Sequence, residues 1–222
     1  MSSGQIQFGF CRRGEAPSSR VLGIEWAEVE QYHSDVVVPA NPHLKERADA
    51  LFTEVPELGL VIKTADCLPV LIASSAHVLA IHAGWRGIEL GIINRAIERL
   101  VFEFPNQRIS ELSVWIGPHI RQASFEVGED VAERLALAAK RAGADSNQIA
   151  KVVTSRPGSI KRWVDLEAIA VLQLKQSGIE TSAISLNSVD TFTSLDYASF
   201  RRDGANAGRN LSFIARRSSL GG

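Results

Sequence analysis

The sequence predicts an α/β fold, a single-domain three-layer sandwich with a mixed sheet. Short apolar runs rich in β-branched residues follow one another closely between Gly59 and His82, which is typical of strands buried in a sheet. Longer segments with apolar residues three or four positions apart come after them, as in amphipathic helices. Because some strands follow one another without a helix between, the sheet should contain antiparallel as well as parallel pairs.

The composition is that of one globular domain covering residues 1–222. Hydrophobic residues make up 45% of the chain, enough to bury a core without disulfides, and the two cysteines, Cys11 and Cys67, favour a cytoplasmic protein. With 24 basic and 25 acidic residues the formal charge is -1, which gives no electrostatic argument for nucleic acid or membrane as a partner. The chain does not start with the apolar segment of a signal peptide, and no run approaches the roughly 18 apolar residues of a membrane span. We therefore expect a soluble, unprocessed protein.

The first fifty residues are irregular. Loop-forming sequences occupy residues 14–20 and 39–42, and residues 35–38 form one candidate strand. We expect strands joined by functional loops in this part of the chain.

Three apolar runs then form the predicted core of the sheet. Residues 59–63, 68–73 and 77–82 are short, closely spaced and rich in Val, Ile and Leu, which predicts consecutive strands in one sheet. Gly84 and Gly87 indicate a turn after the third strand. An amphipathic helix that Pro105 helps to end should follow and pack on the sheet through Ile93, Ile97, Leu100, Val101 and Phe104.

The second half of the chain continues the alternation of strands and helices. Its predicted elements are a strand at 112–117, a helix from about Gly128 to Gly143 with Val131, Leu135 and Ala138 inward, a helix from the N-cap Asp165 to Gly178, and strands at 182–186 and 211–215. No internal repeat, low-complexity run or long linker interrupts them.

Cys67 and His82 lie at the ends of neighbouring predicted strands, where α/β enzymes carry their chemistry. A lone cysteine is often only a small buried hydrophobic residue. The carboxylate beside it, Asp66, is however more useful for orienting a histidine or a metal than for packing. A cysteine and a histidine this close in sequence are either a nucleophile with its base or two ligands of a metal.

His33 would add a second imidazole, since it lies in a polar segment before the candidate strand at 35–38. His33, Cys67 and His82 have the ligand types of a catalytic zinc site whose fourth position is open to water or substrate. Their spacing does not match a finger-like CxxC pattern, so from spacing alone the three residues could equally lie apart in the fold.

The other histidines and the loop arginines are further candidates. His77 begins a strand and is interpreted as structural, His43 lies in a Pro-flanked loop, and His119, in a strand-end loop, could line the same cleft. The sequence has no P-loop and no strand-linked GxGxxG, so neither a nucleoside triphosphate nor a dinucleotide cofactor is expected. Guanidinium groups on loops suit phosphate or carboxylate recognition, and the candidates are Arg13, Arg86, Arg201, Arg202 and Arg209.

Several motifs resemble, in sequence and order, those of the laccase-domain family. TADCLPV and HAGWRG are highly specific, and QYHSD, RADALFT, WIGPHI, FEVGEDV and SFRRDGANAGRNLSFI support the order. Members of this family are described as multicopper polyphenol oxidase-like proteins with purine nucleoside phosphorylase activity, also known as the peptidoglycan editing factor family. The resemblance runs from about residue 31 to the C-terminus. It implies a three-layer fold similar to cysteine hydrolases, and a zinc ion, or copper, held by His33, Cys67 and His82.

The resemblance also implies an activity: phosphorolysis of adenosine, inosine and methylthioadenosine, together with adenosine deamination. We assign Asp66, Cys67 and His82 to the catalytic group. Purine nucleoside and phosphate are the expected partners, bound by Arg13, Arg86, Arg201 and Arg209, and the protein could be a monomer or a homodimer.

Two alternatives stay open. Cys67 could act as nucleophile with His82 as base in an amide hydrolysis that edits serine-containing peptidoglycan precursors. The metal could also be a structural zinc in a protein without catalysis, with His119 completing a closed four-ligand site. Copper-dependent phenol oxidation is disfavoured, because a copper oxidase needs more histidine ligands than one cluster drawn from five histidines can supply.

The chain departs from the family pattern at three places. Residues 1–30 form a shortened N-terminal portion, which predicts that part of the substrate wall is missing. Ser124 and Phe125 stand where relatives commonly have Cys and Tyr, and Asp190 with Thr191 where Cys and Thr are common. None of these changes touches the three proposed ligands, so they bear on substrate preference rather than on metal binding.

Overall fold

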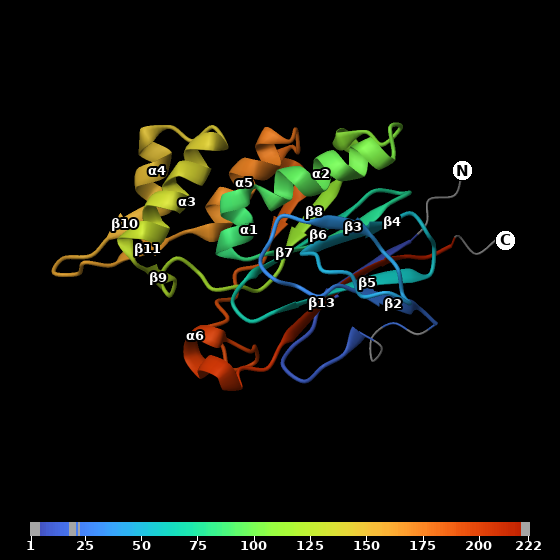
Figure 1. Ribbon diagram of the computed structural model, residues 1–222, viewed down its shortest axis with the longest axis horizontal. Helices are drawn as coiled ribbons and strands as arrows, with labels where there is room; N and C mark the ends of the chain where they lie inside the picture. Colours follow the sequence, from blue (N-terminus) through green and yellow to red (C-terminus); the bar gives the residue numbers. More distant parts are fainter. Residues whose placement is uncertain (1–4, 18–20, 22, 219–222) are drawn as a thin grey trace.

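Two β-sheets lie against each other, and helices cover the outer face of the larger one (Figure 1). The structure is a computed structural model that describes residues 5–17, 21 and 23–218. The larger sheet has six strands and is mixed, since β12–β8 and β3–β4 are parallel pairs and the inner pairs are antiparallel. In spatial order its strands are β12 (Ile184–Leu186), β8 (Ser113–Ile116), β6 (Leu68–Ala73), β7 (Val78–Ala83), β4 (Ala50–Thr53) and β3 (Val37–Pro39).

The second sheet has four strands and is also mixed. Its strands, in spatial order, are β1 (Ile6–Phe10), β13 (Asn210–Arg216), β5 (Leu58–Thr64) and β2 (Glu25–Glu28), with β2 parallel to β5 and the other pairs antiparallel. A small antiparallel sheet of β10 (Val153–Ser155), β11 (Arg162–Val164) and β9 (Glu126–Val127) lies apart from both.

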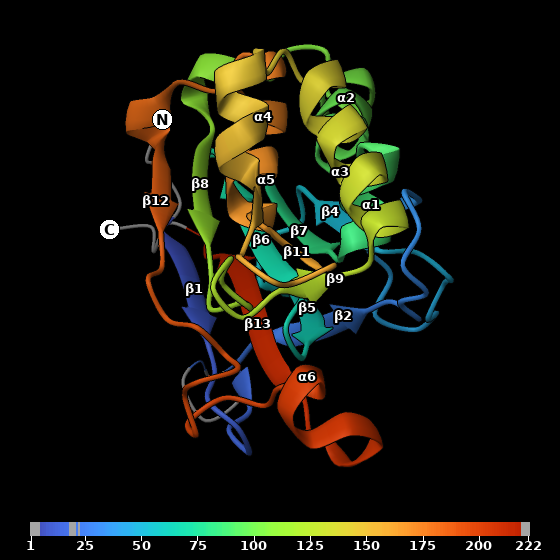
Figure 2. The same ribbon diagram turned by 90° about the vertical axis from the view of Figure 1, so that its left-hand side faces the viewer.

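The helices fall into two groups (Figure 2). One group covers the six-stranded sheet and consists of α1 (Trp85–Leu90), α2 (Ile92–Glu103), α3 (Glu129–Arg141), α4 (Ser146–Val152) and α5 (Leu166–Gln176). The short helix α6 (Phe200–Asp203) lies apart from this group, near the N-terminal end of β13. Single 3₁₀ turns occupy Ile109–Glu111, Thr181–Ala183 and Gly204–Asn206.

The six-stranded sheet is buried on both faces, which explains why its central strands are continuously apolar. Val70 and Ile81 pack into the core beneath the helices, whereas Leu71 and Ala80 pack with Leu60 against the four-stranded sheet. Neighbouring side chains of a strand point to opposite faces, so a strand covered on both sides needs an apolar residue at every position.

Most sequence-based expectations for the helices and for the strands of the second half of the chain are confirmed. The helix packed through Ile93, Ile97 and Leu100 is α2, and it ends before Pro105. Asp165 caps α5 by accepting a hydrogen bond from the Ala168 amide at 2.9 Å. The strands predicted at 112–117, 182–186 and 211–215 are β8, β12 and β13.

The prediction of one sheet for the three apolar runs is wrong. Residues 59–63 belong to β5 in the four-stranded sheet, and only the next two runs, β6 and β7, lie in the six-stranded sheet. Residues 65–67 cross from one sheet to the other, with Asp66 at a positive φ of 87°. A run buried on both faces has the same apolar pattern in either layer, so sequence alone could not assign it.

Two boundaries also differ from expectation. Gly87 does not belong to a turn but lies buried within α1, where a Cβ would come 3.0 Å from the Ser34 carbonyl oxygen. The candidate strand at 35–38 is β3, displaced to Val37–Pro39. Of the loop predicted at 14–20, residues 18–20 lie outside the described residues. Among the residues described, no helix is long and apolar enough to cross a membrane.

Candidate metal centre and pocket

His33, Cys67 and His82 come together in space. One potential ligand atom from each lies within 4.8 Å of the others, and the Cys67 Sγ is 3.8 Å from the His33 Nε2. His82 belongs to β7, whereas His33 and Cys67 lie on connections that cross from one sheet to the other, His33 between β2 and β3 and Cys67 between β5 and β6. The site is therefore built where the two sheets join.

The crossing connections have unusual backbone conformations. Among the described residues, three non-glycine residues have positive φ, and two of these are His33 at 64° and Asp66, next to Cys67, at 87°. This region is costly for most L-residues and persists where surrounding contacts enforce it, often at functional sites.

The Asp49 carboxylate holds His82 and the His33 segment in place through hydrogen bonds. It is fully buried, and its Oδ1 accepts hydrogen bonds from His82 Nδ1 at 2.7 Å and from the His33 amide at 3.0 Å. Its Oδ2 accepts from the Ser34 amide at 2.6 Å and the Ser34 hydroxyl at 2.7 Å. A carboxylate on one imidazole nitrogen fixes the ring and leaves the other nitrogen available for a metal.

Gly84 provides the space that the donors require. A Cβ at this position would come 2.8 Å from the His33 Cδ2 and 3.0 Å from the Cys67 Sγ. The glycine of the HAGWRG motif is thus explained by close approach to two of the three donors.

The charges in the centre are coupled. Burial raises the pKa of Cys67, but the charge of His82 and hydrogen bonds from His33 and His82 lower it to about 6. Burial lowers the pKa of His82, but Cys67 and Asp49 raise it to about 9. Burial raises the pKa of Asp49, while His82 and Ser34 lower it to about 2. Without a metal the centre therefore favours a thiolate beside an imidazolium.

The donor set fits a zinc-type metal. Zn–S bonds of ~2.3 Å and Zn–N bonds of ~2.1 Å in tetrahedral geometry place a sulfur and a nitrogen ligand roughly 3.5 Å apart, close to the 3.8 Å between Cys67 Sγ and His33 Nε2. In the described part of the chain the cluster comprises these three residues alone. Three protein donors beside a cavity match a catalytic site, in which one position is left for water or substrate.

A pocket of about 660 Å³ opens next to the three donors. Trp85, Ile120, Phe125 and Phe200 give it apolar walls. Its charged lining is mainly basic and consists of Lys45, Lys63, Arg86, Arg201 and Arg209, with Glu30 and Asp66 as the acidic members. An apolar pocket with convergent charged groups suits a flat ring that carries, or reacts with, an anion.

The predicted substrate arginines divide into two groups. Arg86, Arg201 and Arg209 line the pocket, with the Arg86 guanidinium 4.4 Å from the Trp85 ring and the Arg201 guanidinium 5.6 Å from that of Phe125. Arg13 is not among the lining residues and pairs with Asp203 at 3.7 Å. Arg202 donates to several backbone carbonyls and holds the loop around α6.

The other histidines lie outside the centre. His77 is buried, donates to the Gln107 Oε1 at 2.7 Å and stacks on Phe104, which confirms its structural interpretation. His119 is also buried, donates to the Gly117 carbonyl at 2.8 Å and faces Glu167, so it does not join the three donors. His43 is exposed.

Two of the residues that depart from the family pattern, Ser124 and Asp190, touch each other. The Ser124 hydroxyl donates to the Asp190 carboxylate at 2.6 Å, Phe125 lines the pocket, and the Thr191 hydroxyl donates to Asp66 at 2.7 Å. These departures therefore lie in and behind one wall of the pocket, away from the metal donors.

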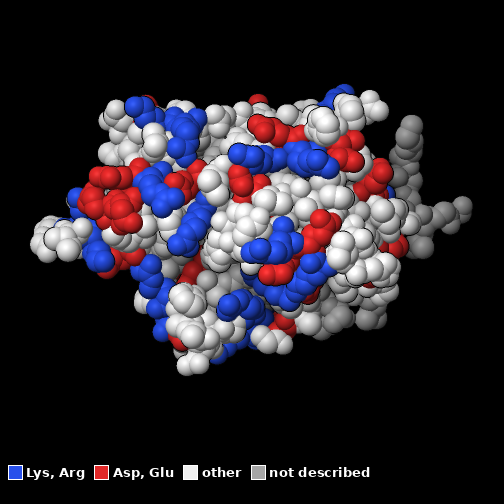
Figure 3. All heavy atoms as spheres, in the orientation of Figure 1, with Lys and Arg blue, Asp and Glu red and all other residues white. Residues whose placement is uncertain are grey.

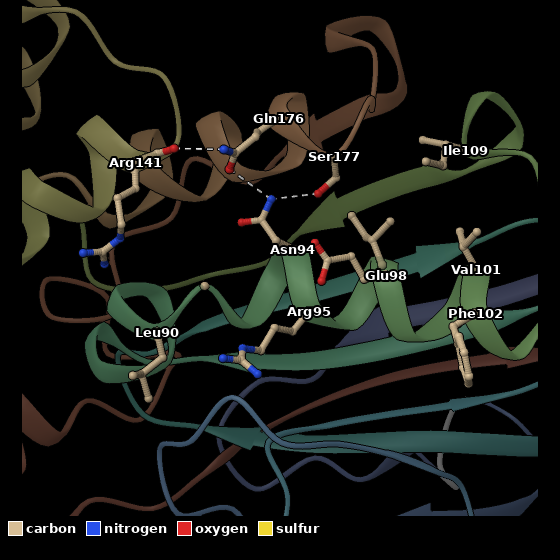
Figure 4. A pocket seen from close by; sticks show the side chains of 12 residues that line it. Leu90, Asn94, Arg95, Glu98, Val101, Phe102, Ile109, Arg141, Gln176 and Ser177 are labelled. Carbon is tan, nitrogen blue, oxygen red and sulfur yellow. Dashed lines mark hydrogen bonds between the residues drawn. The ribbon is translucent and has the colours of Figure 1, made fainter.

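A larger hollow of about 950 Å³ lies on the helical face and is separate from this chemistry (Figure 4). Asn94 there donates to the side chains of Gln176 and Ser177. No cysteine or histidine is among the described residues that line it. On the face in Figure 3, basic and acidic side chains are interspersed.

Sequence reasoning missed Asp49, Phe200 and Lys63 as parts of the site. A usable signal existed for Asp49, since a carboxylate between Ala48 and Ala50 at the start of an apolar strand must have buried partners. Gln31 also escaped notice; its side chain bonds both the amide and the carbonyl of Lys63, which anchors the His33 segment to β5.

The chain belongs to the family described as multi-copper polyphenol oxidoreductase laccase, whose model matches residues 15–217. The purine nucleoside phosphorylase PA4543 of Pseudomonas aeruginosa is 35% identical over 189 residues, covering 84% of this chain and 72% of that protein. The adenosine deaminase RL5 of an unknown prokaryotic organism is 32% identical over 175 residues, 78% of this chain and 63% of that protein. The crystal structure of Neisseria meningitidis NMB0706 superposes with a TM-score of 0.76 at 31% identity, covering 90% of this chain and 78% of that one.

Proposed function

We propose that this protein is a zinc-dependent purine nucleoside enzyme that phosphorolyses adenosine, inosine and methylthioadenosine and deaminates adenosine. The observation that carries the proposal is a cluster of three metal-type donors beside a pocket with aromatic walls and a basic lining. The names of the relatives, a purine nucleoside phosphorylase and an adenosine deaminase, point to the same substrate class.

His33, Cys67 and His82 would hold the metal. Zinc suits a thiolate with two imidazoles, and when bound it supplies Lewis acidity and lowers the pKa of a bound water towards ~7. Copper is the alternative ion for the same donors. The adjoining pocket supports a catalytic rather than a closed structural centre.

The pocket residues would bind and orient the substrates. The rings of Phe125 and Phe200 would stack on the purine, and Arg86, Arg201 and Arg209 would hold phosphate beside the ribose. In phosphorolysis a phosphate oxygen bonds to C1′ while the C1′–N9 bond breaks. The purine leaves with that electron pair, takes up a proton, and ribose 1-phosphate is the second product.

The test is to assay purified protein with adenosine, with and without phosphate, before and after chelation and zinc restoration. Adenine that requires phosphate supports phosphorolysis, and inosine supports deamination. His33→Ala should abolish both, whereas His43→Ala, which changes an exposed histidine outside the cluster, should not. If zinc-loaded protein with intact His33 forms neither adenine, hypoxanthine nor inosine, the proposal is wrong.

A second function has one observation in its favour. Cys67 adjoins His82, which Asp49 orients, and this is the order of a nucleophile, base and carboxylate triad. The Cys67 thiolate would then attack the carbonyl carbon of an amide in a serine-containing peptidoglycan precursor. The C–N bond would break, the amine would leave with a proton from His82, and water would hydrolyse the resulting thioester. Rapid alkylation of Cys67 in zinc-saturated protein and cleavage of such a precursor would favour it, whereas stoichiometric zinc that protects Cys67 would count against it.

The proposal includes the remaining sequence-based expectations. These are a single domain over residues 1–222, a likeness to cysteine hydrolases, catalytic roles for Cys67 and His82, a supporting role for Asp66, and a substrate role for Arg13. We also propose a cytoplasmic location and no nucleic-acid or membrane partner. Light scattering of purified protein would decide between monomer and homodimer.

A further inference from the structure

Asp66 connects three segments of the chain that are far apart in sequence. Its Oδ1 accepts a hydrogen bond from the Thr191 hydroxyl at 2.7 Å, and its Oδ2 accepts one from the Arg201 amide at 2.7 Å. Its backbone carbonyl accepts from the Ile120 amide at 2.9 Å. Thr191 is fully buried, so this contact lies behind the pocket wall rather than in solvent.

The segments that Asp66 holds carry the pocket wall. Ile120, Phe200 and Arg201 all line the pocket. Helix α6, which carries the last two, has four residues and buries none of them, and Phe200 is 58% exposed. Hydrophobic packing therefore contributes little to its position, and polar contacts such as the one from Asp66 must supply the rest.

The Asp66 carboxylate is directed to the Thr191 hydroxyl and the Arg201 amide and not to the metal centre. Asp66 immediately precedes Cys67 but is not among the clustered metal-type donors. Its backbone, at a φ of 87°, turns the chain so that Cys67 faces the centre while the Asp66 side chain reaches Thr191 and α6. A strained backbone of this kind is kept where its contacts require it.

We infer that Asp66 is a positioning residue that sets the substrate wall: it fixes α6, and through it Phe200 and Arg201, relative to the metal centre. This replaces the place in the catalytic group, and the orientation of a histidine or a metal, that the position of Asp66 beside Cys67 first indicated. The effect on substrate binding rests on the proposed function, but the effect on the position of α6 does not.

Two substitutions separate the carboxylate from the backbone strain. Asp66→Asn keeps an oxygen acceptor for the Arg201 amide and can bond Thr191 through its NH₂ group, and Asn tolerates positive φ. Asp66→Gly tolerates positive φ still better but has no acceptor. Thr191→Val removes one of the two contacts while leaving residue 66 unchanged.

Limited trypsin digestion of the zinc-loaded protein measures how firmly α6 is held, and it needs no activity assay. Cleavage after Arg201 and Arg202 should accelerate roughly tenfold to hundredfold in Asp66→Gly, since two hydrogen bonds to a charged group are lost, and less in Thr191→Val. Asp66→Asn should remain within about threefold of the original chain. Cleavage after Lys161, in the exposed loop between β10 and β11, is the internal control and should not change.

Where the nucleoside activity is present, the kinetics give the second readout. Asp66→Gly should raise KM for phosphate and nucleoside about tenfold or more with a smaller change in kcat, with Asp66→Asn restoring most of the loss. If Asp66→Asn is as inactive as Asp66→Gly while trypsin cleavage stays slow in both, Asp66 acts on protons and the inference is overturned. Unchanged cleavage after Arg201 and Arg202 in Asp66→Gly also overturns it, whether or not the protein acts on purines.

Discussion

The two sides of the pocket are held in different ways. On the metal side, His82 lies in a buried central strand. The Asp49 carboxylate accepts hydrogen bonds from His82 and from the amides of His33 and Ser34. On the substrate side, the segment from residue 190 to 209 has little regular structure and is held mainly by side chains that bond backbone groups.

Arg202 and Asn210 show how the substrate side is held. The Arg202 guanidinium donates to the carbonyls of Thr191, Phe192, Ser194 and Tyr197 at 2.8–3.1 Å. Asn210 bonds both the amide and the carbonyl of Ala198. The comparison teaches that the metal-type donors are anchored through a packed strand and a buried carboxylate, whereas the facing wall of the pocket is a loop held by hydrogen bonds.

Asp49→Ala should have the largest effect, because it leaves several buried donors without an acceptor. We expect a loss of about 3–5 kcal/mol of unfolding free energy and a 10–100-fold lower zinc affinity. Urea unfolding and zinc titration would measure the two. Glu103→Gln, which breaks an exposed pair with Arg99, is the control and should cost about 0.5 kcal/mol or less. If Asp49→Ala retains full zinc affinity, the metal side does not depend on its buried carboxylate.

Acid should lower the free energy of unfolding through protonation of His119. Burial lowers the pKa of His119 to about 4, and the Thr191 amide donates to its carbonyl. Its neighbours Arg121, Glu167, Asp165 and Asp190 are also charged groups. Because its folded pKa lies below the unfolded value of ~6.5, the unfolded state takes up the proton first. Stability is therefore intact above pH ~6.5 and falls by up to about 3 kcal/mol as the pH drops towards 4.

His119→Gln isolates this contribution, since the neighbouring groups are the same in both proteins. Urea unfolding of chelator-treated protein at pH 7 and pH 5 should show a smaller acid loss in the variant. Equal losses in the two proteins would show that His119 does not set the acid limit.

Arg202→Ala should loosen the substrate side alone. Four carbonyls lose a charged donor, and we expect about 2–3 kcal/mol less protection of the amides in residues 190–209. Hydrogen exchange would measure this, with the amides of β6 and β7 unchanged and zinc affinity kept. Arg12→Ala, which removes an exposed pair with Asp196, is the matched control. Exchange that accelerates equally in β6 and β7 would show that the two sides open together.

Gly84→Ala should have the smallest effect on stability and act on the metal side. The added Cβ would meet His33 and Cys67, at a cost of about 1–2 kcal/mol. Zinc affinity should fall more than unfolding free energy, because the displaced atoms belong to two of the three donors. Gly208→Ala, whose Cβ would meet only ordinary contacts of 3.8 Å or more, should change neither. Equal zinc affinity in the two variants would contradict the close approach at Gly84.

Sequence reasoning predicted the metal side better than the substrate side. His33, Cys67 and His82 lie in specific motifs, although their spacing alone did not require them to meet. The sequence around Asp49 signals that its carboxylate has buried partners but not which they are, because they are backbone amides and a histidine at other places in the chain. Arg13 was grouped with the pocket arginines because its loop sequence shows a guanidinium but not its partners, of which Asp203 is one.

The fold showed the same limit. Helices such as α5 were predictable from a local cap and periodicity, whereas the layer to which β5 belongs depends on pairing with β13, about 150 residues away in the sequence. The sequence of a short apolar strand indicates that the strand is buried, but it does not indicate which strands it pairs with.

The two connections that carry His33 and Cys67 between the sheets have a consequence for how the chain assembles. His82 is fixed by the six-stranded sheet alone, but the other two donors reach it only when both sheets have formed and docked. A partly folded chain with one sheet in place would lack the complete donor set. Zinc uptake during refolding should therefore occur late and report sheet docking, and bound zinc should slow the separation of the two sheets.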